Sequence, residues 1–324
     1  MTLNTGNIKE IAFGALDVYE KDGKTCFSRF EGEPINEYGR VGKSTASILL
    51  DFYTDSESLS IDYTVERCID RKHAYFDLYE NEVMISHFGA TVEKESSIFE
   101  EHFETKLSKG EKRIRLYLPN LFEAKISAFS LDDGAFFKRS EKKKSLLMMG
   151  DSITHGYDAY FPSLSYANTI AREFDFDMTN QAIGGEMFRT RGLPETTSLS
   201  PDYITVAYGT NDWSWSGKTL DEITENANAY FTKLTSLYPN AEIFYISPLY
   251  RGDEGRITTL GDFFGAVERF SEVAKKFGCK VINGRDLIPH SSLMFDDKYL
   301  HPNDLGFTQY AKALEKELRK LGVC

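Results

Sequence analysis

The 324-residue chain has few cysteines, and the four that it has lie far apart, at Cys26, Cys68, Cys279 and Cys324. No two of them have the CxxC spacing of a zinc or redox site. A disulfide framework and a structural metal are therefore not expected, and reduced thiols in the cytoplasm are the simplest interpretation. The N-terminal residues also lack the basic-then-apolar pattern of a signal peptide. We expect a cytoplasmic location.

Positive charge and long apolar runs are scarce as well. Lysine and arginine number 38 against 50 aspartates and glutamates, which gives a formal net charge of -12. A nucleic-acid partner is not expected, because binding phosphates needs a basic surface. No apolar run approaches the ~20 residues of a membrane-spanning helix, so no membrane partner is expected. The acidity favours a neutral or cationic ligand over a polyanion, unless a local basic site overrides it.

The remaining composition is that of a folded globular protein, with 41% hydrophobic and 14% aromatic residues. The length suggests about two domains. Residues 1–137 carry short alternating or apolar runs rich in β-branched and aromatic residues, which predict an all-β sandwich or jelly roll. The clearest of these runs are 47–53, 59–65, 75–79, 83–85 and 112–119.

The rhythm changes after a charge run at 138–144, which we interpret as a solvated linker. From residue 145 to 324, short apolar strands alternate with amphipathic helices, a pattern that predicts a parallel sheet with helices on both faces. Strands are expected at 146–149, 175–180, 203–207, 242–246 and 280–282, and helices at 165–173, 220–237, 261–277 and 304–321.

Four polar segments stand at the ends of these elements. They are Gly150-Asp151-Ser152-Ile153-Thr154, Asn180-Gln181-Ala182-Ile183-Gly184-Gly185, Gly209-Thr210-Asn211-Asp212 and His301-Pro302-Asn303. In open parallel sheets, sites form at the carboxyl ends of the strands, and Ser152, Gly185 and Asn211 each follow such an end. The pattern therefore predicts that the segments meet.

Each segment offers one group that ester hydrolysis needs. A serine hydroxyl is a poor nucleophile until a base takes its proton, and His301, held beside a proline, is a candidate base. The N–H of a glycine and the amide of an asparagine can donate to a developing oxyanion. Taken singly, Ser152 also suits a helix N-cap, and Gly185 and Asn211 suit turns.

Together and in this order, the four segments resemble the SGNH (GDSL-type) hydrolase superfamily over roughly residues 145–324. The resemblance implies a flavodoxin-type three-layer α/β domain with Ser152 as nucleophile and His301 as base. It also implies an oxyanion hole made by the N–H groups of Ser152 and Gly185 and the amide of Asn211. No metal and no organic cofactor are implied.

The third member of the expected triad departs from the superfamily's spacing. The aspartate of the family stands three residues before the histidine, where this chain has Lys298. Asp297 lies four residues before His301, and one extra residue in the loop still allows it to reach the imidazole. A Ser–His dyad with a backbone carbonyl orienting the ring is the alternative.

Aromatic residues near the motifs are candidates for substrate binding. Trp213 and Trp215, the chain's two tryptophans, follow Asn211, and Tyr157 follows Ser152. Their faces can stack on a sugar ring or line an acyl pocket, although ordinary packing is the competing interpretation.

A β-sandwich ahead of an SGNH-like domain is similar to acetyl esterases that act on plant polysaccharide fragments. That resemblance implies a serine esterase that removes acetyl or short acyl groups from carbohydrate, with a small-molecule or oligosaccharide ester as its partner. A general GDSL-type lipase, acylhydrolase or thioesterase is the enzymatic alternative. A sugar-binding module with a degenerate site is the non-enzymatic one.

Overall fold

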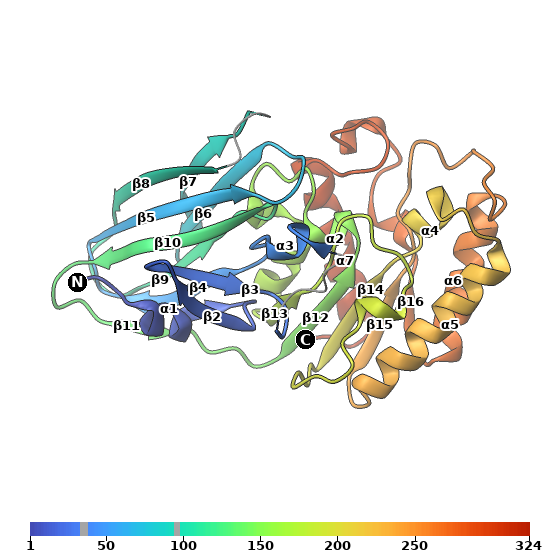
Figure 1. The fold of residues 1–324 in the computed structure, drawn as a ribbon, viewed down its shortest axis with the longest axis horizontal. Helices are drawn as coiled ribbons and strands as arrows, with labels where there is room; N and C mark the ends of the chain where they lie inside the picture. Colours follow the sequence, from blue (N-terminus) through green and yellow to red (C-terminus); the bar gives the residue numbers. More distant parts are fainter. Residues whose placement is uncertain (33–37, 94–97) are drawn as a thin grey trace. The chain divides into compact units, whose positions relative to one another are not determined.

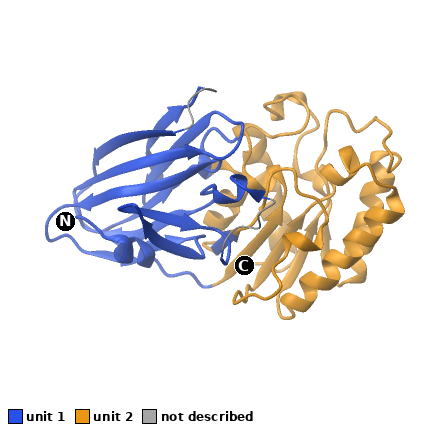
Figure 2. Cartoon of the chain, viewed as in Figure 1, with its two compact units in different colours: residues 1–143, 159–163, 177–179 blue, residues 144–158, 164–176, 180–324 orange. Residues whose placement is uncertain are grey.

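The computed structural model describes residues 1–32, 38–93 and 98–324. Contacts between Cα atoms divide the chain into two compact units (Figure 2). Two short segments of the predicted second domain belong to the first unit. Unit 1 comprises residues 1–143, 159–163 and 177–179, and unit 2 comprises residues 144–158, 164–176 and 180–324.

Unit 1 is built from two antiparallel β-sheets, preceded by the short helix α1 (Thr5–Ile11). One sheet has the order β1-β4-β9-β6-β7 with β11 paired to β4, and the other has the order β2-β3-β10-β5-β8 (Figure 1). The strands are β1 (Ala12–Phe13), β2 (Asp17–Lys21), β3 (Lys24–Ser28), β4 (Leu49–Thr54), β5 (Ser58–Arg67), β6 (His73–Glu80), β7 (Val83–Thr91), β8 (Ile98–Lys106), β9 (Lys112–Tyr117), β10 (Phe122–Leu131) and β11 (Phe137–Arg139).

Aromatic side chains join the two sheets of unit 1 into a sandwich. Phe52 on β4 meets Phe129 on β10 edge-to-face at 6.0 Å between ring centroids. Tyr63 on β5 lies 4.6 Å from Phe76 on β6 by the same measure. All four rings are buried, so each sheet turns one face of its alternating strands toward the other. The predicted all-β sandwich is confirmed.

The sequence suggested that the charge run at 138–144 is a solvated linker. In the structure, part of this run packs against the sandwich. The first two residues of the run, Lys138 and Arg139, lie in β11 and pair with β4. Lys142 has a 6% exposed side chain and donates to Asp51 at 2.7 Å. A buried carboxylate on β4 thus draws part of the run onto the sandwich, an interaction between distant residues that composition does not reveal.

The sheet that follows is parallel and has the order β13-β12-β14-β15-β16. Numbered along the chain, this is 2-1-3-4-5, the flavodoxin-type order, whose ligand site lies where the strand order reverses. The predicted fold class is therefore confirmed. The strands are β12 (Ser145–Gly150), β13 (Asp177–Asn180), β14 (Tyr203–Ala207), β15 (Glu242–Ile246) and β16 (Lys280–Ile282).

Helices cover both faces of this sheet. On one face α5 and α6 pack together (Figure 1). On the other, α3 and α7 meet through Tyr166 and Tyr310, whose rings stack at 4.2 Å. The helices are α2 (Ser152–His155), α3 (Tyr166–Glu173), α4 (Thr210–Trp215), α5 (Leu220–Leu237), α6 (Phe263–Lys276) and α7 (Asp304–Lys320), with short 3-10 turns at η2 (Val41–Lys43), η3 (Pro162–Leu164), η4 (Thr190–Gly192), η5 (Gly284–Leu287) and η6 (Ser292–Met294).

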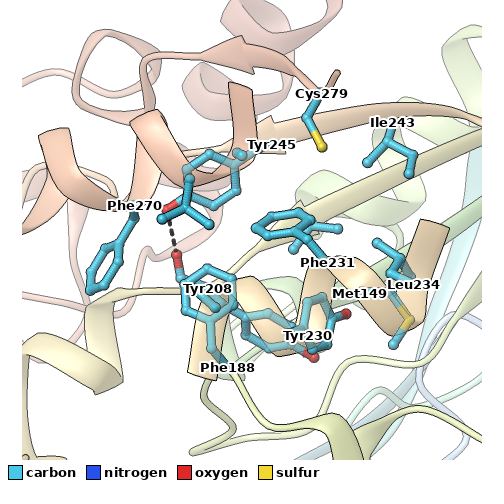
Figure 3. Close-up of a cluster of buried hydrophobic side chains, with 14 of the residues drawn as sticks. Met149, Phe188, Tyr208, Tyr230, Phe231, Leu234, Ile243, Tyr245, Phe270 and Cys279 are labelled. Carbon is cyan, nitrogen blue, oxygen red and sulfur yellow. Dashed lines mark hydrogen bonds between the residues drawn. The ribbon is translucent and has the colours of Figure 1, made fainter. Parts of the chain in front are cut away.

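The core beneath α5 and α6 is aromatic (Figure 3). Phe188, which precedes η4, packs within 6.2 Å of five other rings, including Tyr245 of β15 and Phe231 of α5. The hydroxyl of Tyr245 donates to the carbonyl of Tyr208 at 3.1 Å, so this buried polar group is satisfied. The core thereby fixes the segments after β13 and β14, which carry Gly185 and Asn211.

Within the described residues, no helix combines the length and the apolar character that crossing a bilayer would require.

Candidate active site

Ser152 stands two residues after the end of β12, at the first position of α2. The turn between them is tight: a Cβ atom placed on Gly150 would lie 2.1 Å from the hydroxyl oxygen of Thr154. Asp151, not Ser152, caps the helix, and its Oδ1 accepts from the N–H of Ile153 at 3.0 Å. The Ser152 hydroxyl is therefore not used in capping and is available to another partner.

That partner is His301. The Oγ atom of Ser152 lies 2.9 Å from Nε2 of His301, although 149 residues separate them. His301 sits on the loop between η6 and α7, where its carbonyl accepts from the N–H of Asp296 at 2.9 Å and Pro302 bridges to Phe295. This is the contact that a base needs to take a proton from a hydroxyl.

Asp297 orients the imidazole from the opposite side. Its Oδ2 lies 2.7 Å from Nδ1 of His301, while its Oδ1 accepts from the N–H groups of Tyr299, Leu300 and His301 at 3.0, 2.8 and 3.1 Å. Burial by itself raises the pKa of the Asp297 carboxyl. The hydrogen bonds from His301 and from the backbone outweigh burial and hold the pKa well below its usual range. Asp297 thus stays ionised beside the ring.

The left-handed conformation of Lys298 allows this loop to hold one residue more than the family's usual spacing. Its φ is +72°, in the left-handed region that side chains other than glycine rarely adopt. The loop folds back so that Asp297 faces three successive N–H groups and the ring together. Gly252 braces it from outside, donating its N–H to the carbonyl of Tyr299 at 2.8 Å. A Cβ on Gly252 would lie 2.9 Å from Cβ of Tyr299.

A second carboxylate lies near the same imidazole nitrogen. The Oδ2 atom of Asp158 is 3.9 Å from Nδ1 of His301, beyond hydrogen-bond length, and its side chain is 10% exposed. Asp158 also has a positive φ of 65°, so the turn after α2 aims it at the site. Asp158 follows Ser152 closely enough in the sequence to border the same pocket, but no motif spacing selected it as a neighbour of His301.

Two backbone N–H groups lie on neighbouring segments, which the N–H of Ile183 joins by donating to the carbonyl of Gly150 at 3.0 Å. The N–H of Ser152 points out of the first turn of α2, and that of Gly185 follows the end of β13. Among the described residues neither has a hydrogen-bond acceptor. Gly185 has a φ of +82°, which favours glycine here. These are the free backbone donors that an oxyanion needs.

The amide of Asn211 is held in one orientation. Its Oδ1 accepts from Nε1 of Trp215 at 3.2 Å, and its Nδ2 donates to the carbonyl of Glu186 at 3.0 Å. An amide nitrogen carries two hydrogens, so one remains for a ligand. Because the two existing bonds need opposite ends of the amide, they also fix which end faces the site.

Tyr157 lies against the loop that carries His301 rather than in open solvent. Its ring stacks on that of His301 at 5.8 Å, and it is 9% exposed. Its hydroxyl lies so close to Gly184 that a Cβ there would be 2.0 Å away. Gly184 is therefore needed for space, whereas Gly185 is favoured by its φ.

The comparisons with known proteins identify a family for this part of the chain. Residues 148–308 match the model of the GDSL-like Lipase/Acylhydrolase family. They form a GDSL-like lipase/acylhydrolase domain. Ser152, Gly185, Asn211, Asp297 and His301 all lie inside this GDSL-like domain. No curated protein sequence matches the chain significantly.

Solved structures share the two-part architecture of the whole chain. A salicylyl-acyltransferase from a tetracycline biosynthetic pathway is 21% identical, with a TM-score of 0.79 over 96% of this chain and 94% of its own. A family two carbohydrate esterase from Cellvibrio japonicus is 14% identical, with a TM-score of 0.69 over 99% of this chain and 97% of its own. An acetyl xylan esterase from the rumen bacterium Butyrivibrio proteoclasticus is 17% identical, with a TM-score of 0.65 over 100% of both chains. At these identities the likeness establishes the fold.

The two tryptophans of the GDSL-like domain lie differently, although both were expected to meet a substrate. Trp213 is 1% exposed, donates to the carbonyl of Gly261 at 3.2 Å and packs on Phe263, so its face is covered. Trp213 therefore has no exposed face on which a substrate could stack, contrary to the expectation from the sequence. Trp215 is 63% exposed, and its ring lies 3.7 Å from where a Cβ of Gly185 would be.

Arg251 was not anticipated from the sequence, because it belongs to no motif. Its guanidinium is buried and donates to the carbonyl and the hydroxyl of Thr210 at 3.1 and 2.9 Å, and it lies 4.8 Å from the ring of Trp213. It thereby ties the loop after β15 to the start of α4, which carries Asn211. Only the meeting of distant segments reveals this role.

Two buried carboxyl groups lie beneath the GDSL-like site. Burial raises the pKa of Asp151 to about 6 and that of Asp212 to about 7. Asp212 accepts from the N–H of Phe188 at 3.1 Å through Oδ1, while within the described residues its Oδ2 has no hydrogen-bond partner. Neither carboxyl contacts the Ser152 hydroxyl, so both are best understood as supports of the surrounding turns.

Across residues 1–32, 38–93 and 98–324, no group of three or more histidine, cysteine, aspartate or glutamate side chains is arranged to hold a metal ion.

Proposed function

We propose that this protein is a serine esterase that removes acetyl or other short acyl groups from carbohydrate, through an acyl-enzyme. One observation carries the proposal: Ser152, His301 and Asp297 form a continuous chain of contacts at 2.9 and 2.7 Å. That chain ends beside donors suited to an oxyanion. Such an arrangement activates a serine toward an ester carbonyl.

In the proposed first step, Oγ of Ser152 attacks the carbonyl carbon while Nε2 of His301 takes its proton. Asp297 keeps the remaining proton on Nδ1 and stabilises the imidazolium that forms. The carbonyl oxygen becomes an oxyanion, which the N–H groups of Ser152 and Gly185 and the second amide hydrogen of Asn211 bind. These donors are held by the backbone and by existing hydrogen bonds, so little reorganisation is needed at the moment of reaction.

In the second step the tetrahedral intermediate collapses and the carbon–oxygen bond to the sugar breaks. His301 returns its proton to the departing sugar oxygen, which leaves an acyl-Ser152 ester. Water, activated by the same imidazole, then attacks the acyl carbon and releases the acid. His301 thus takes and returns the proton in both steps, as general base and then as general acid.

The carbohydrate part of the proposal is supported by the surface beside the site. Trp215 presents an exposed face next to Gly185, a suitable platform for a sugar ring. Tyr157 and Gly184 close the space near His301. One of the similar structures described above is named a carbohydrate esterase and another an acetyl xylan esterase, which supports the same substrate class for this chain.

The test compares hydrolysis of p-nitrophenyl acetate, butyrate and octanoate by the wild type and by Ser152→Ala. We expect preference for acetate in the wild type and loss of at least ~10³-fold in kcat in the variant. A fluorophosphonate probe should label the wild type at Ser152 and leave the variant unlabelled.

The other outcomes point to the alternatives. Rates that rise with acyl-chain length would replace the proposal with a lipase or general acylhydrolase. Equal inactivity of both proteins toward these esters and toward acetylated oligosaccharides, with no labelling, would leave a sugar-binding module.

A further inference from the structure

A pocket of about 440 Å³ lies in the same unit as the site, on segments that follow those of Gly185 and Asn211 in the chain. It is bordered by the residues around η4, by the segment after α4 and by one face of α5. Three of its lining residues are the cations Arg189, Arg191 and Lys218, and Asn226 adds an amide. None of the lining residues is acidic. In a chain of net charge -12, such a grouping of positive charge is a local exception.

The wall of this pocket is held rigidly. Phe188 anchors its start, because the ring lies in the aromatic core (Figure 3) and its N–H donates to Asp212. Lys233 of α5 donates to the carbonyls of Thr190 and Leu193 at 3.4 and 3.1 Å and so fastens η4 to the helix. The guanidinium of Arg191 is therefore carried on a fixed backbone.

The three cations differ in their exposure. Arg189 is half-buried and lies 3.6 Å from the carboxylate of Glu186. Arg191 and Lys218 are exposed in the pocket wall. A group of opposite charge that enters the pocket would meet these two first.

Chain connectivity places the pocket close to the oxyanion donors. Gly185 and Arg189 are four residues apart, so their Cα atoms are separated by at most ~14 Å. On the other wall, Asn211 and Trp215 are about 6 Å apart along α4, and Lys218 follows within at most ~11 Å. Trp215 lies next to Gly185 and, in the sequence, between Asn211 and Lys218. The donors and the cations are therefore no farther apart than the chain between them allows, a length that a short oligosaccharide spans.

We propose that this basic pocket binds an anionic group, a carboxylate or a phosphate, on the part of the substrate that extends past Trp215. This inference rests on the proposed esterase function and narrows its substrate to acylated carbohydrate that carries a negative charge. The acidity of the whole chain had favoured a neutral or cationic ligand; the pocket supplies the local basic site that reverses this preference. Arginine and lysine are the usual partners of carboxylates and phosphates.

The experiment uses three acetylated sugars of similar size: an acetylated methyl glucoside, an acetylated methyl glucuronoside and an acetylated glucose with a phosphate on its anomeric oxygen. For each, kcat/KM is measured for the wild type and for Arg191→Gln/Lys218→Gln. Arg189 is left in place because it also faces Glu186. The matched control is Lys312→Gln/Lys316→Gln, which removes the same charge from exposed positions of α7.

We expect the wild type to prefer at least one anionic ester over the neutral one. In the pocket variant the ratio of anionic to neutral kcat/KM should fall about tenfold, mainly through KM, and in the control it should not change. If this ratio falls only for the glucuronoside, the pocket binds carboxylates. If it falls only for the phosphorylated sugar, the pocket binds phosphates. A ratio that is the same in all three proteins overturns the proposal.

A binding measurement separates this inference from the proposed function. Calorimetry on Ser152→Ala with the corresponding unacetylated sugars should give at least about tenfold tighter binding of one anion than of methyl glucoside. The added pocket substitutions should remove that difference. Anion binding without hydrolysis by the wild type would sustain the pocket and reject the esterase, whereas hydrolysis without preferential anion binding would reject the pocket alone.

Discussion

Asp297 contacts His301 at 2.7 Å although four positions separate them in the chain, one more than in the family's usual spacing. The contact survives because the loop places one extra residue, Lys298, in a left-handed conformation. The carboxylate is then fixed by three backbone N–H groups as well as by the ring. We therefore propose a triad rather than a dyad.

The first prediction concerns this carboxylate. Asp297→Asn should lower kcat for p-nitrophenyl acetate by ~10² to 10⁴, because an amide no longer fixes the tautomer or stabilises the imidazolium. Asp158→Asn should cost far less, since Asp158 is 3.9 Å from Nδ1. Asp296→Asn, at an exposed position next to Asp297, is the matched control. A larger loss in Asp158→Asn than in Asp297→Asn would assign the third role to Asp158 instead.

Lys298 provides the second prediction, which concerns backbone strain. Lys298→Gly should retain kcat and leave the free energy of unfolding unchanged or up to ~1 kcal/mol higher, because glycine adopts a φ of +72° without a steric penalty. Lys298→Val should lower both, because a β-branched side chain resists this conformation. Urea denaturation and steady-state kinetics measure the two effects. Equal behaviour of the two variants would show that the left-handed turn does not hold Asp297 in place.

Gly184 allows a third prediction about space. In Gly184→Ala the new methyl group must displace Tyr157, whose ring stacks on His301, so kcat should fall by at least about tenfold. Gly255→Ala is the control, because no atom lies within 4 Å of a Cβ there and its φ is not positive. If both variants keep wild-type kcat, Tyr157 does not position the imidazole.

The fourth prediction follows from the buried carboxyl of Asp212. Its folded pKa of about 7 lies above the ordinary value of 3.8. The folded protein therefore holds a proton that the unfolded chain releases, so the stability contributed by this group is present below that ordinary value and is lost as the pH rises toward 7. A pKa that differs by one between the folded and unfolded states corresponds to about 1.4 kcal/mol.

Asp212→Asn should remove this dependence while keeping an acceptor for the N–H of Phe188. Between pH 5 and pH 8, the free energy of unfolding should fall less in Asp212→Asn than in the wild type or in Asp296→Asn, as urea denaturation would measure. Asp151, with its pKa raised to about 6, should continue to contribute a smaller loss. An unchanged slope in the variant would mean that Asp212 is ionised in the folded protein throughout this range.

Much of the second unit could be predicted from local pattern. The strands at Tyr203–Ala207 and Glu242–Ile246 and the helix at Leu220–Leu237 have the predicted bounds. Each is specified by the spacing of its own apolar residues, which needs no information from the rest of the chain. The same pattern placed Ser152, Gly185 and Asn211 at the carboxyl ends of strands.

Features that depend on meetings between distant segments could not be predicted. The composition of Gly209-Thr210-Asn211-Asp212 suggested a turn, yet α4 begins at Thr210. Because a helix rotates about 100° per residue, Trp213 and Trp215 point to nearly opposite sides, one into the core and one to the surface. Without the helix, the sequence could not distinguish them.

The sequence by itself determined the order of the elements, the parallel sheet and the residue types that gather at its edge, because periodicity and motif order are local properties. Only the tertiary structure decided that Asp297 reaches His301, that Arg251 supports the start of α4, and that Arg189, Arg191 and Lys218 share one pocket. These depend on a single left-handed residue and on side chains from segments about 30 to 40 positions apart, and no local pattern encodes either.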